Sequence, residues 1–144
     1  INLSDLYRQL GRDGDGERVL RESLSRSPQD ASLHHALGLT LVRQKRAEAA
    51  LHELRQAAVL DPGQARYAYV YAVGLNSIGR RDDAIVVLQE GLRAHPNNLA
   101  MLSAAMNFSR EKGDNAAALE YAERLARLLP DDSRLGDLIR ELKR

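Results

Sequence analysis

Residues 52–56 contain the beginning of a zinc-binding pattern. In that pattern two histidines lie four residues apart on one helical face, and the glutamate after the first histidine acts as a base. His52 and Glu53 fit, but Gln56 stands where the second histidine is needed. A single imidazole gives a zinc ion too few protein ligands. We therefore expect no metal site in this stretch.

Two adjacent histidines and a short acidic stretch are the other candidates for metal binding. His34 and His35 are neighbours, so on a helix their side chains point about 100° apart and do not easily share one ion. Asp13, Asp15 and Glu17 alternate with glycines, but this spacing lacks the third ligand and the bidentate glutamate of a calcium loop. Ordinary packing for the histidines and a turn for the acidic stretch are the simpler interpretations.

Motifs for catalysis and for cofactor binding are missing from the sequence. It contains no phosphate-binding glycine loop, no dinucleotide fingerprint and no Ser-His-Asp order. Gly11, Gly14 and Gly16 lie close together, but no strand pattern precedes them. We expect a protein that is not an enzyme and that binds neither a cofactor nor a metal.

Composition narrows the fold class. The chain has 144 residues, about the length of one domain. Aromatic residues make up only 4%, with no Trp and one Phe. The core must therefore be built from Leu, Ala, Val and Ile, which favours closely packed helices over a sheet sandwich.

Charge and cysteine content exclude several classes of partner. Twenty-one Lys and Arg against 20 Asp and Glu leave a net charge of +1, and the two signs are interspersed. This pattern predicts a solvated polar face and no nucleic-acid partner. The chain has no Cys, so neither a disulfide nor a thiolate zinc site can form.

Membrane insertion is not expected, because no apolar run approaches the roughly 20 residues that span a bilayer. We expect a soluble protein of the cytoplasm or the periplasm, and the sequence leaves the compartment open. The chain begins with Ile1 in the middle of a pattern and shows no targeting segment. We interpret it as part of a longer protein.

The four prolines reveal an internal repeat. Pro28, Pro62, Pro96 and Pro130 are equally spaced along the chain, which has no other proline. The surrounding residues repeat with the same period. Ala50, Ala84 and Ala118 hold one fixed place before the last three prolines, and Lys45, Gly79 and Gly113 hold one fixed place after the first three.

Each repeat contains two blocks of helical periodicity. In residues 31–44 Leu33, Leu37 and Leu41 form one stripe, and a second stripe follows in residues 47–60. A glycine in the left-handed conformation ends the first helix, and the proline ends the second. Such a helical hairpin cannot bury its apolar face alone and must stack on its neighbours.

These units resemble the tetratricopeptide repeat, with a small residue at the eighth place, alanine at the twentieth and proline at the thirty-second. The resemblance implies an all-α fold, a right-handed superhelical solenoid of antiparallel helix pairs with about four repeats. We expect a single domain over residues 1–144 that is divided into a partial repeat 1–30, repeats 31–64, 65–98 and 99–132, and a capping helix 133–144. The last segment fits the first helix of a further repeat equally well.

The resemblance also implies where a partner binds. In this family the first helix of each pair lines a concave groove, whereas the second helix covers the back. It places His34 toward the core and His35 toward the groove. The groove residues that we expect to contact a partner are His35, Leu39, Arg43, Arg66, Tyr69, Val70, Val73, Asn76, Asn107 and Arg110.

The expected function is to bind a peptide or helix of another protein in this groove, as a non-catalytic scaffold. Apolar residues flanked by arginines suit an acidic, amphipathic partner. The alternative is a structural element for self-association, or for docking onto another domain of the same protein, through the open N-terminal end near Leu3, Leu6, Tyr7 and Leu10. The paired Lys, Asn and Arg residues that clamp chaperone tails are absent, because Ala36, Val70 and Ala104 hold the sixth places. The sequence also weakly resembles the repeat region of some bacterial multihaem cytochrome proteins.

Overall fold

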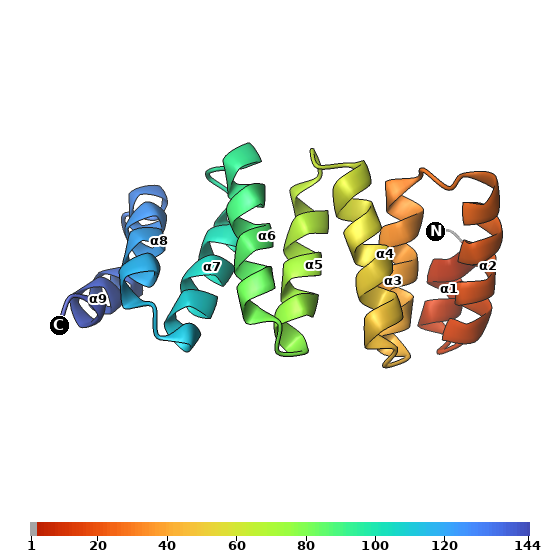
Figure 1. Cartoon of the computed structure of the whole chain (residues 1–144), viewed down its shortest axis with the longest axis horizontal. Helices are drawn as coiled ribbons and strands as arrows, with labels where there is room; N and C mark the ends of the chain where they lie inside the picture. Colours follow the sequence, from red (N-terminus) through yellow and green to blue (C-terminus); the bar gives the residue numbers. More distant parts are fainter. Residues whose placement is uncertain (1–2) are drawn as a thin grey trace. The chain divides into compact units, whose positions relative to one another are not determined.

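The computed structural model describes residues 3–144, apart from the side chain of Gln9. Over that range the chain forms nine α-helices and no strand (Figure 1). In chain order the helices are α1 (Leu3–Gln9), α2 (Asp13–Arg26), α3 (Ala31–Arg43), α4 (Ala47–Leu60), α5 (Ala65–Ser77), α6 (Arg81–Ala94), α7 (Leu99–Lys112), α8 (Asn115–Leu128) and α9 (Ser133–Leu142).

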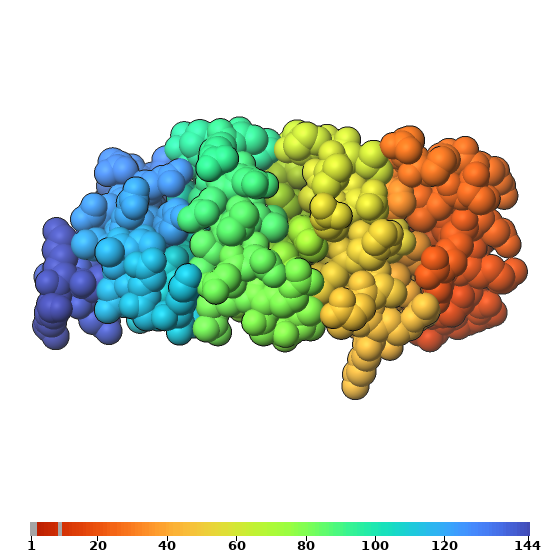
Figure 2. Space-filling view, viewed as in Figure 1, coloured from red at the N-terminus to blue at the C-terminus, as the bar shows by residue number. Residues whose placement is uncertain are grey.

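The chain divides into two compact units, Ile1–Gly74 and Leu75–Arg144. In the first unit α1 packs on α2, α2 on α3, and α3 on α4. The space-filling view shows α4, in gold, largely covering α3 (Figure 2). Leu20 of α2, Leu37 and Leu41 of α3 and Ala50 of α4 form a buried cluster. This core is aliphatic, as the composition predicts.

In the second unit α6 packs on α7, α7 on α8, and α8 on α9. Its buried side chains are again mostly small or aliphatic, and α7 contributes the largest share of them. They include Leu88, Leu92, Met101, Leu102, Ala105, Met106, Ala118, Ala122 and Leu125. Helix pairs therefore bury their apolar faces against the next helix in both units.

Four residues with positive φ end the first helix of a pair. They are Gly11, Gly79 and Gly113 at φ of 71°, 86° and 86°, and Lys45 at φ of 60°. Glycine adopts this left-handed conformation without a Cβ clash, whereas lysine does so at a cost. The repeat therefore fixes the backbone shape at this place even where its usual residue is absent.

Carboxylate and amide side chains begin several helices. Asp30, Asn98, Asp114 and Asp132 each accept a hydrogen bond from a backbone N–H of the first helical turn. The bond satisfies a donor that the helix itself leaves unpaired. At Asp30 the Ser32 hydroxyl also donates to the carboxylate, and these bonds lower the pKa of Asp30 below its usual value.

Gly38 allows α3 and α4 to approach each other closely. A Cβ built on Gly38 would lie 2.6 Å from Cδ2 and 2.7 Å from Cγ of Leu54. Since real Cβ atoms do not approach that closely, a side chain at this place requires the helices to move apart. The small residue expected at the eighth place thus serves helix packing in this repeat.

Helix α9 differs from the first helices before it. Its exposed Arg140 holds the place that is buried as Gly38, Ala72 and Met106 in the earlier repeats. Its exposed Lys143 holds the place that is buried as Leu41, Leu75 and Ser109. Leu135 is the buried residue of α9, which packs on α8. The face that would meet a second helix of its own is therefore charged.

The structure confirms the predicted fold class, because residues 3–144 are helical pairs joined by short turns and include no strand. None of the described helices is both long and apolar enough to cross a lipid bilayer. Within the described residues no three His, Asp or Glu side chains gather where they could hold a metal ion.

Candidate interaction surface

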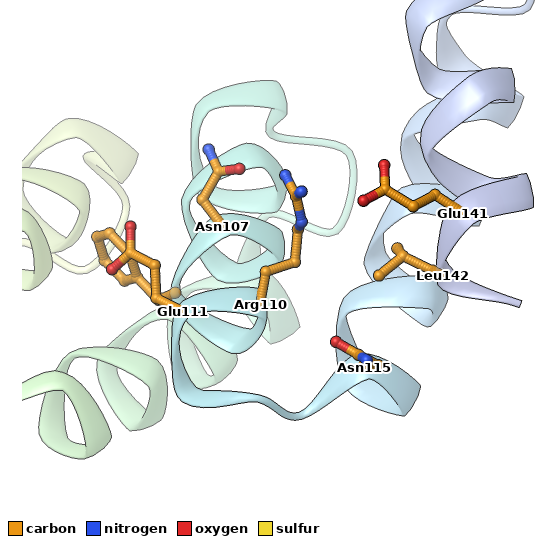
Figure 3. Close-up of a pocket in the computed structure, with 7 residues that line it drawn as sticks. Asn107, Arg110, Glu111, Asn115, Glu141 and Leu142 are labelled. Atoms are coloured by element: carbon orange, nitrogen blue, oxygen red, sulfur yellow. The ribbon is translucent and has the colours of Figure 1, made fainter. Parts of the chain in front are cut away.

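The second unit contains a hollow of about 600 Å³ between α7, the start of α8 and α9 (Figure 3). Most of the side chains that line it are polar or charged, with apolar ones at its edges. They are Asn107, Phe108, Arg110, Glu111, Asn115, Glu141 and Leu142. Asn107 and Arg110 are two of the groove residues that the sequence predicts, so the structure brings them together beside a cavity.

Arg110 and Glu141 face each other across this hollow. Figure 3 shows the Arg110 side chain reaching from α7 into the gap, and the Glu141 carboxylate pointing from α9 toward it. Both residues are exposed. Among the described residues neither side chain has an ion pair or a hydrogen bond. The hollow therefore offers a guanidinium and a carboxylate that remain available to a bound molecule.

The sequence prediction missed Glu141, although the repeat points to it. Glu141 lies one repeat length after Asn107, so the two hold the same place in successive first helices. Because residues 133–144 were interpreted as a cap, the groove places were not carried into α9. The spacing alone was the signal that could have identified this residue.

Ion pairs between α6 and α7 engage the neighbours of Arg110. Arg81 binds Glu111 at 3.1 Å, and Lys112 binds Asp82 at 2.9 Å. Arg81 also donates to the side-chain oxygen of Asn76 at 3.3 Å. In Figure 3 Glu111 accordingly points away from the gap that Arg110 enters. The side-chain oxygen of the predicted groove residue Asn76 thus already accepts a hydrogen bond from Arg81 within the protein.

In the first unit His35 is buried, although the sequence places it on the groove side. His35, expected on the groove side, is only 8% exposed, and its ring lies 4.7 Å from that of Tyr67. Neither ring nitrogen of His35 has a hydrogen-bond partner within the described chain. Burial, and then the nearby charge of Arg66, lower the pKa of His35. A partner can therefore reach little of this residue.

His34, expected toward the core, has a side chain that is 14% exposed and that forms hydrogen bonds through both ring nitrogens. Its Nδ1 lies 2.6 Å from Oε2 of Glu53, and its Nε2 lies 2.8 Å from the carbonyl oxygen of Pro28. His34 thus lies mostly buried against α4, whereas His35 is buried where the sequence places it beside the groove, and its contact with a partner stays a prediction. The ring of Tyr67 covers His35, whereas the carboxylate of Glu53 attracts His34 toward α4.

The predicted groove arginines of the first unit differ in availability. Arg43 donates to Asp13 at 3.0 Å and to the Thr40 hydroxyl at 3.1 Å, so it joins α3 to α2. Arg66 is exposed and lies near His35. Arg66 is therefore the cation of this set that is better placed to meet an acidic partner.

The predicted apolar groove residues lie at the surface to different degrees. Val73 is 39% exposed, whereas Leu39, Tyr69 and Val70 are half-buried. None of the four is fully enclosed in the core. They can contribute apolar contact area, and Tyr69 adds a hydroxyl that can form hydrogen bonds.

Successive helix pairs, in which α2 to α8 are each 13 or 14 residues long, define a helical-repeat protein. A family model described as "Tetratricopeptide repeat" matches residues 1–105. The chain belongs to the tetratricopeptide repeat family. Tetratricopeptide repeats are protein-interaction modules.

A relative by sequence is the uncharacterized protein y4yS of Sinorhizobium fredii (strain NBRC 101917 / NGR234). It is 33% identical over 93 residues, which cover 65% of this chain and 50% of that protein. The chain therefore spans about half the length of this curated relative.

Solved structures share the fold. A crystal structure of MamA has a TM-score of 0.83 at 20% identity and covers 99% of this chain and 83% of its own. The structure MamA MSR-1 C2 has a TM-score of 0.72 at 25% sequence identity and covers 91% of this chain and 75% of its own. The crystal structure of the APC/C hetero-tetramer Cut9-Hcn1 has a TM-score of 0.72 at 18% sequence identity and covers 97% of this chain and 28% of that one.

Proposed function

We propose that this chain is a protein-interaction module that binds a peptide or a helix of a partner protein on the faces of its first helices. The observation that carries the proposal is the hollow in the second unit, where predicted groove residues meet Glu141 beside the available Arg110. Tetratricopeptide repeats bind proteins in general, so the family supports the same function. The partner and its site on this chain belong to the proposal.

The chemistry of the hollow suits a polypeptide. Arg110 and the amides of Asn107 and Asn115 can donate hydrogen bonds to a bound molecule, and Glu141 can accept them. A peptide main chain presents both kinds of group at every residue. Phe108 and Leu142 at the edge add apolar contact. An acidic side chain of the partner would pair with Arg110 in this unit or with Arg66 in the first.

Arg110→Glu is the substitution that tests the hollow, and Arg93→Glu is its matched control. Arg93 is exposed on α6 and lies outside the hollow, and its substitution makes the same change in charge. We expect Arg110→Glu to lose most partner capture from an extract of the source cell, while Arg93→Glu keeps it. Equal capture by the two variants, at unchanged helical circular dichroism, would contradict the proposal.

The face of the first unit has its own test. Tyr69→Ala combined with Val73→Glu should abolish capture and leave the helical circular dichroism intact, because both side chains are partly exposed. Loss of the helical signal would show that these residues belong to the core. For an acidic partner, affinity should fall as salt screens Arg66 and Arg110.

The domain organisation is part of the same proposal. Helices α3–α4, α5–α6 and α7–α8 correspond to the three full repeats, and α1–α2 to the partial one. We interpret α9 as a cap, because Arg140 and Lys143 are charged and exposed where earlier first helices are buried. The alternative function in assembly has one supporting observation, the exposed leucines of α1. The likeness to multihaem cytochrome proteins stays a prediction.

A further inference from the structure

The first helix carries an apolar stripe that the described chain leaves exposed. Leu3, Leu6 and Leu10 are 48%, 43% and 60% exposed. Their spacing places them on one side of a helix. Ser4 and Tyr7 of α1 face α2, since a Cβ built on Gly16 of α2 would lie 3.6 Å from the Ser4 carbonyl oxygen and 3.7 Å from Cβ of Tyr7. A large part of each leucine side chain remains open to a further contact.

These places are buried in the second and fourth repeats, whereas Tyr71 and Gly74, which hold them in the third, are half-buried. One repeat after Leu3 and Leu6 stand Leu37 and Thr40, which are 0% and 3% exposed. Three repeats after them stand Ala105 and Phe108, at 0% and 8%. In α3 and α7 these residues lie on a helix that packs on the second helix of the preceding pair, α2 or α6. Among the described residues, no second helix of a preceding pair packs against Leu3 and Leu6 of α1.

The two covering helices share a pattern. Helix α2 carries Leu20 and Leu24, and both pack in the cluster that contains Leu37. Helix α6 carries Leu88 and Leu92 at the same repeat places, and both are buried. Two leucines four residues apart lie on one helical face. In this chain, a second helix thus packs against the following first helix through two leucines that lie four residues apart.

An ion pair adds a charge to the pattern. Arg46, directly before α4, binds Glu17 of α2 at 2.8 Å, and Glu17 lies three residues before Leu20. Arg21 of α2 also binds Glu17 at 2.8 Å, and the side-chain oxygen of Gln44 accepts a hydrogen bond from Arg46 at 3.0 Å. Arg12 holds the place of Arg46 one repeat earlier and is exposed, with Asp15 as its partner. An acidic residue on a covering helix would find a cation at Arg12.

We propose that the leucine stripe of α1 is a docking surface for an amphipathic helix of a polypeptide other than residues 1–144. That helix carries two leucines four residues apart and an acidic residue three places before the first. A second copy of this chain does not present such a helix. Helices α2, α6 and α8 already pack against the helix that follows each of them, and Leu51 of α4 contacts Gly74 of α5.

A fusion that supplies this helix tests the proposal on the whole chain. A copy of residues 13–34 placed directly before Ile1 stands to α1 as α2 stands to α3, because Ile1 and His35 are one repeat apart. The matched control carries Leu20→Glu and Leu24→Glu in the added copy only. We expect the first fusion to raise Tm by about 5 °C and to slow amide exchange in α1 at least tenfold, and the control to do neither.

Substitution of the stripe completes the design. Leu3→Glu with Leu6→Glu should leave Tm of the unfused chain unchanged within about 1 °C, because exposed positions tolerate such changes. The same pair should abolish the gain in the fusion. The proposal is overturned if the fusion and its control behave alike, or if the pair destabilises the unfused chain, since the leucines would then belong to its own core. Sedimentation that shows a dimer of the unfused chain, lost on Leu3→Glu with Leu6→Glu, would assign the surface to a second copy instead.

Discussion

His34 and Glu53 join the two helices of one repeat, with Nδ1 of His34 lying 2.6 Å from Oε2 of Glu53. The other ring nitrogen contacts the carbonyl oxygen of Pro28, in the turn before α3. Burial by itself would lower the pKa of His34, but the bonds to Glu53 and Pro28 outweigh it and raise that pKa. The protonated imidazole therefore links α3, α4 and the preceding turn.

The first prediction is that this link weakens with rising pH. A folded pKa above the ordinary value of about 6.5 means that the stabilisation is fully present below that value and is lost as pH rises through the folded pKa. Replacing His34 by Gln should cost about 1–2 kcal/mol of unfolding free energy at pH 6, and less at higher pH. Urea unfolding at a series of pH values measures this. A His34→Gln variant whose stability runs parallel to that of the wild type at every pH would refute it.

The second prediction concerns the neighbouring histidine, whose pH dependence has the opposite sign. Burial lowers the pKa of His35, so its contribution is present above the ordinary value and is lost as pH falls below it. His35→Phe keeps a ring against Tyr67 and removes two buried nitrogens that lack partners in the described chain. We expect a gain of about 1 kcal/mol at neutral pH and a larger gain at pH 5.

Thermal and urea unfolding of His35→Phe at pH 5 and pH 7 would test this. Since the two histidines titrate with opposite effects, the pH series for His34 is best measured in the His35→Phe background. A loss of stability in His35→Phe at both pH values would show that the imidazole makes a contact that phenylalanine cannot replace.

The third prediction uses the left-handed residue Lys45. At φ of 60° this lysine carries a strain that glycine does not. Lys45→Gly should therefore raise the unfolding free energy by about 0.5–1 kcal/mol, the relief of strain being partly offset by the greater freedom of glycine in the unfolded chain.

Gly79→Ala is the reverse experiment, and Lys45→Ala is the neutral control. Gly79 has φ of 86° and no atom near its missing Cβ, so the cost of about 1 kcal/mol would be purely conformational. Equal stabilities of Lys45→Gly and Lys45→Ala in urea unfolding would argue against strain at this position.

The fourth prediction concerns the contact between Gly38 and Leu54. Gly38→Ala gains helix propensity, but its Cβ would overlap the Leu54 side chain. We expect the cost of the overlap to exceed the gain in helix propensity, so that the free energy of unfolding falls by about 1–2 kcal/mol. In a Leu54→Ala background most of the loss should disappear, because Cγ and Cδ2 of Leu54 are gone and only the backbone nitrogen, 3.2 Å from the added Cβ, remains close. A double-mutant cycle in urea measures this coupling, and strictly additive effects would exclude the overlap as the cause.

The repeat made most of the fold predictable. The spacing of Pro28, Pro62, Pro96 and Pro130 located the helix pairs, and the glycines located the ends of first helices. A regular period specifies the fold because each unit must bury the same face in the same way. Lys45 was the exception in the pattern, and it takes the backbone conformation of the glycines it replaces.

The candidate site was predictable only in part. Periodicity indicates which face of a helix a residue occupies, and Asn107 and Arg110 both line the hollow, whereas their contact with a partner stays a prediction. It does not indicate which polar groups are already used inside the protein, and so the pairing of Arg43 with Asp13 was not foreseen. It also does not indicate the partners of His34 and His35, because Glu53 and Tyr67 lie on other helices.

The exposed leucines of α1 and the charged residues of α9 make the two ends of the chain differ in how well each could accept an added helix pair. A new helix pair could be added before α1, where an apolar face is ready to accept it, but Arg140 and Lys143 would have to lose their hydration to admit a second helix beside α9. Lengthening by duplication of one whole repeat should therefore succeed upstream of α1 or between existing pairs, and fail downstream of α9. Variants with one duplicated repeat inserted before α1, between existing pairs or after α9, compared by their soluble expression, would test this difference between the two ends.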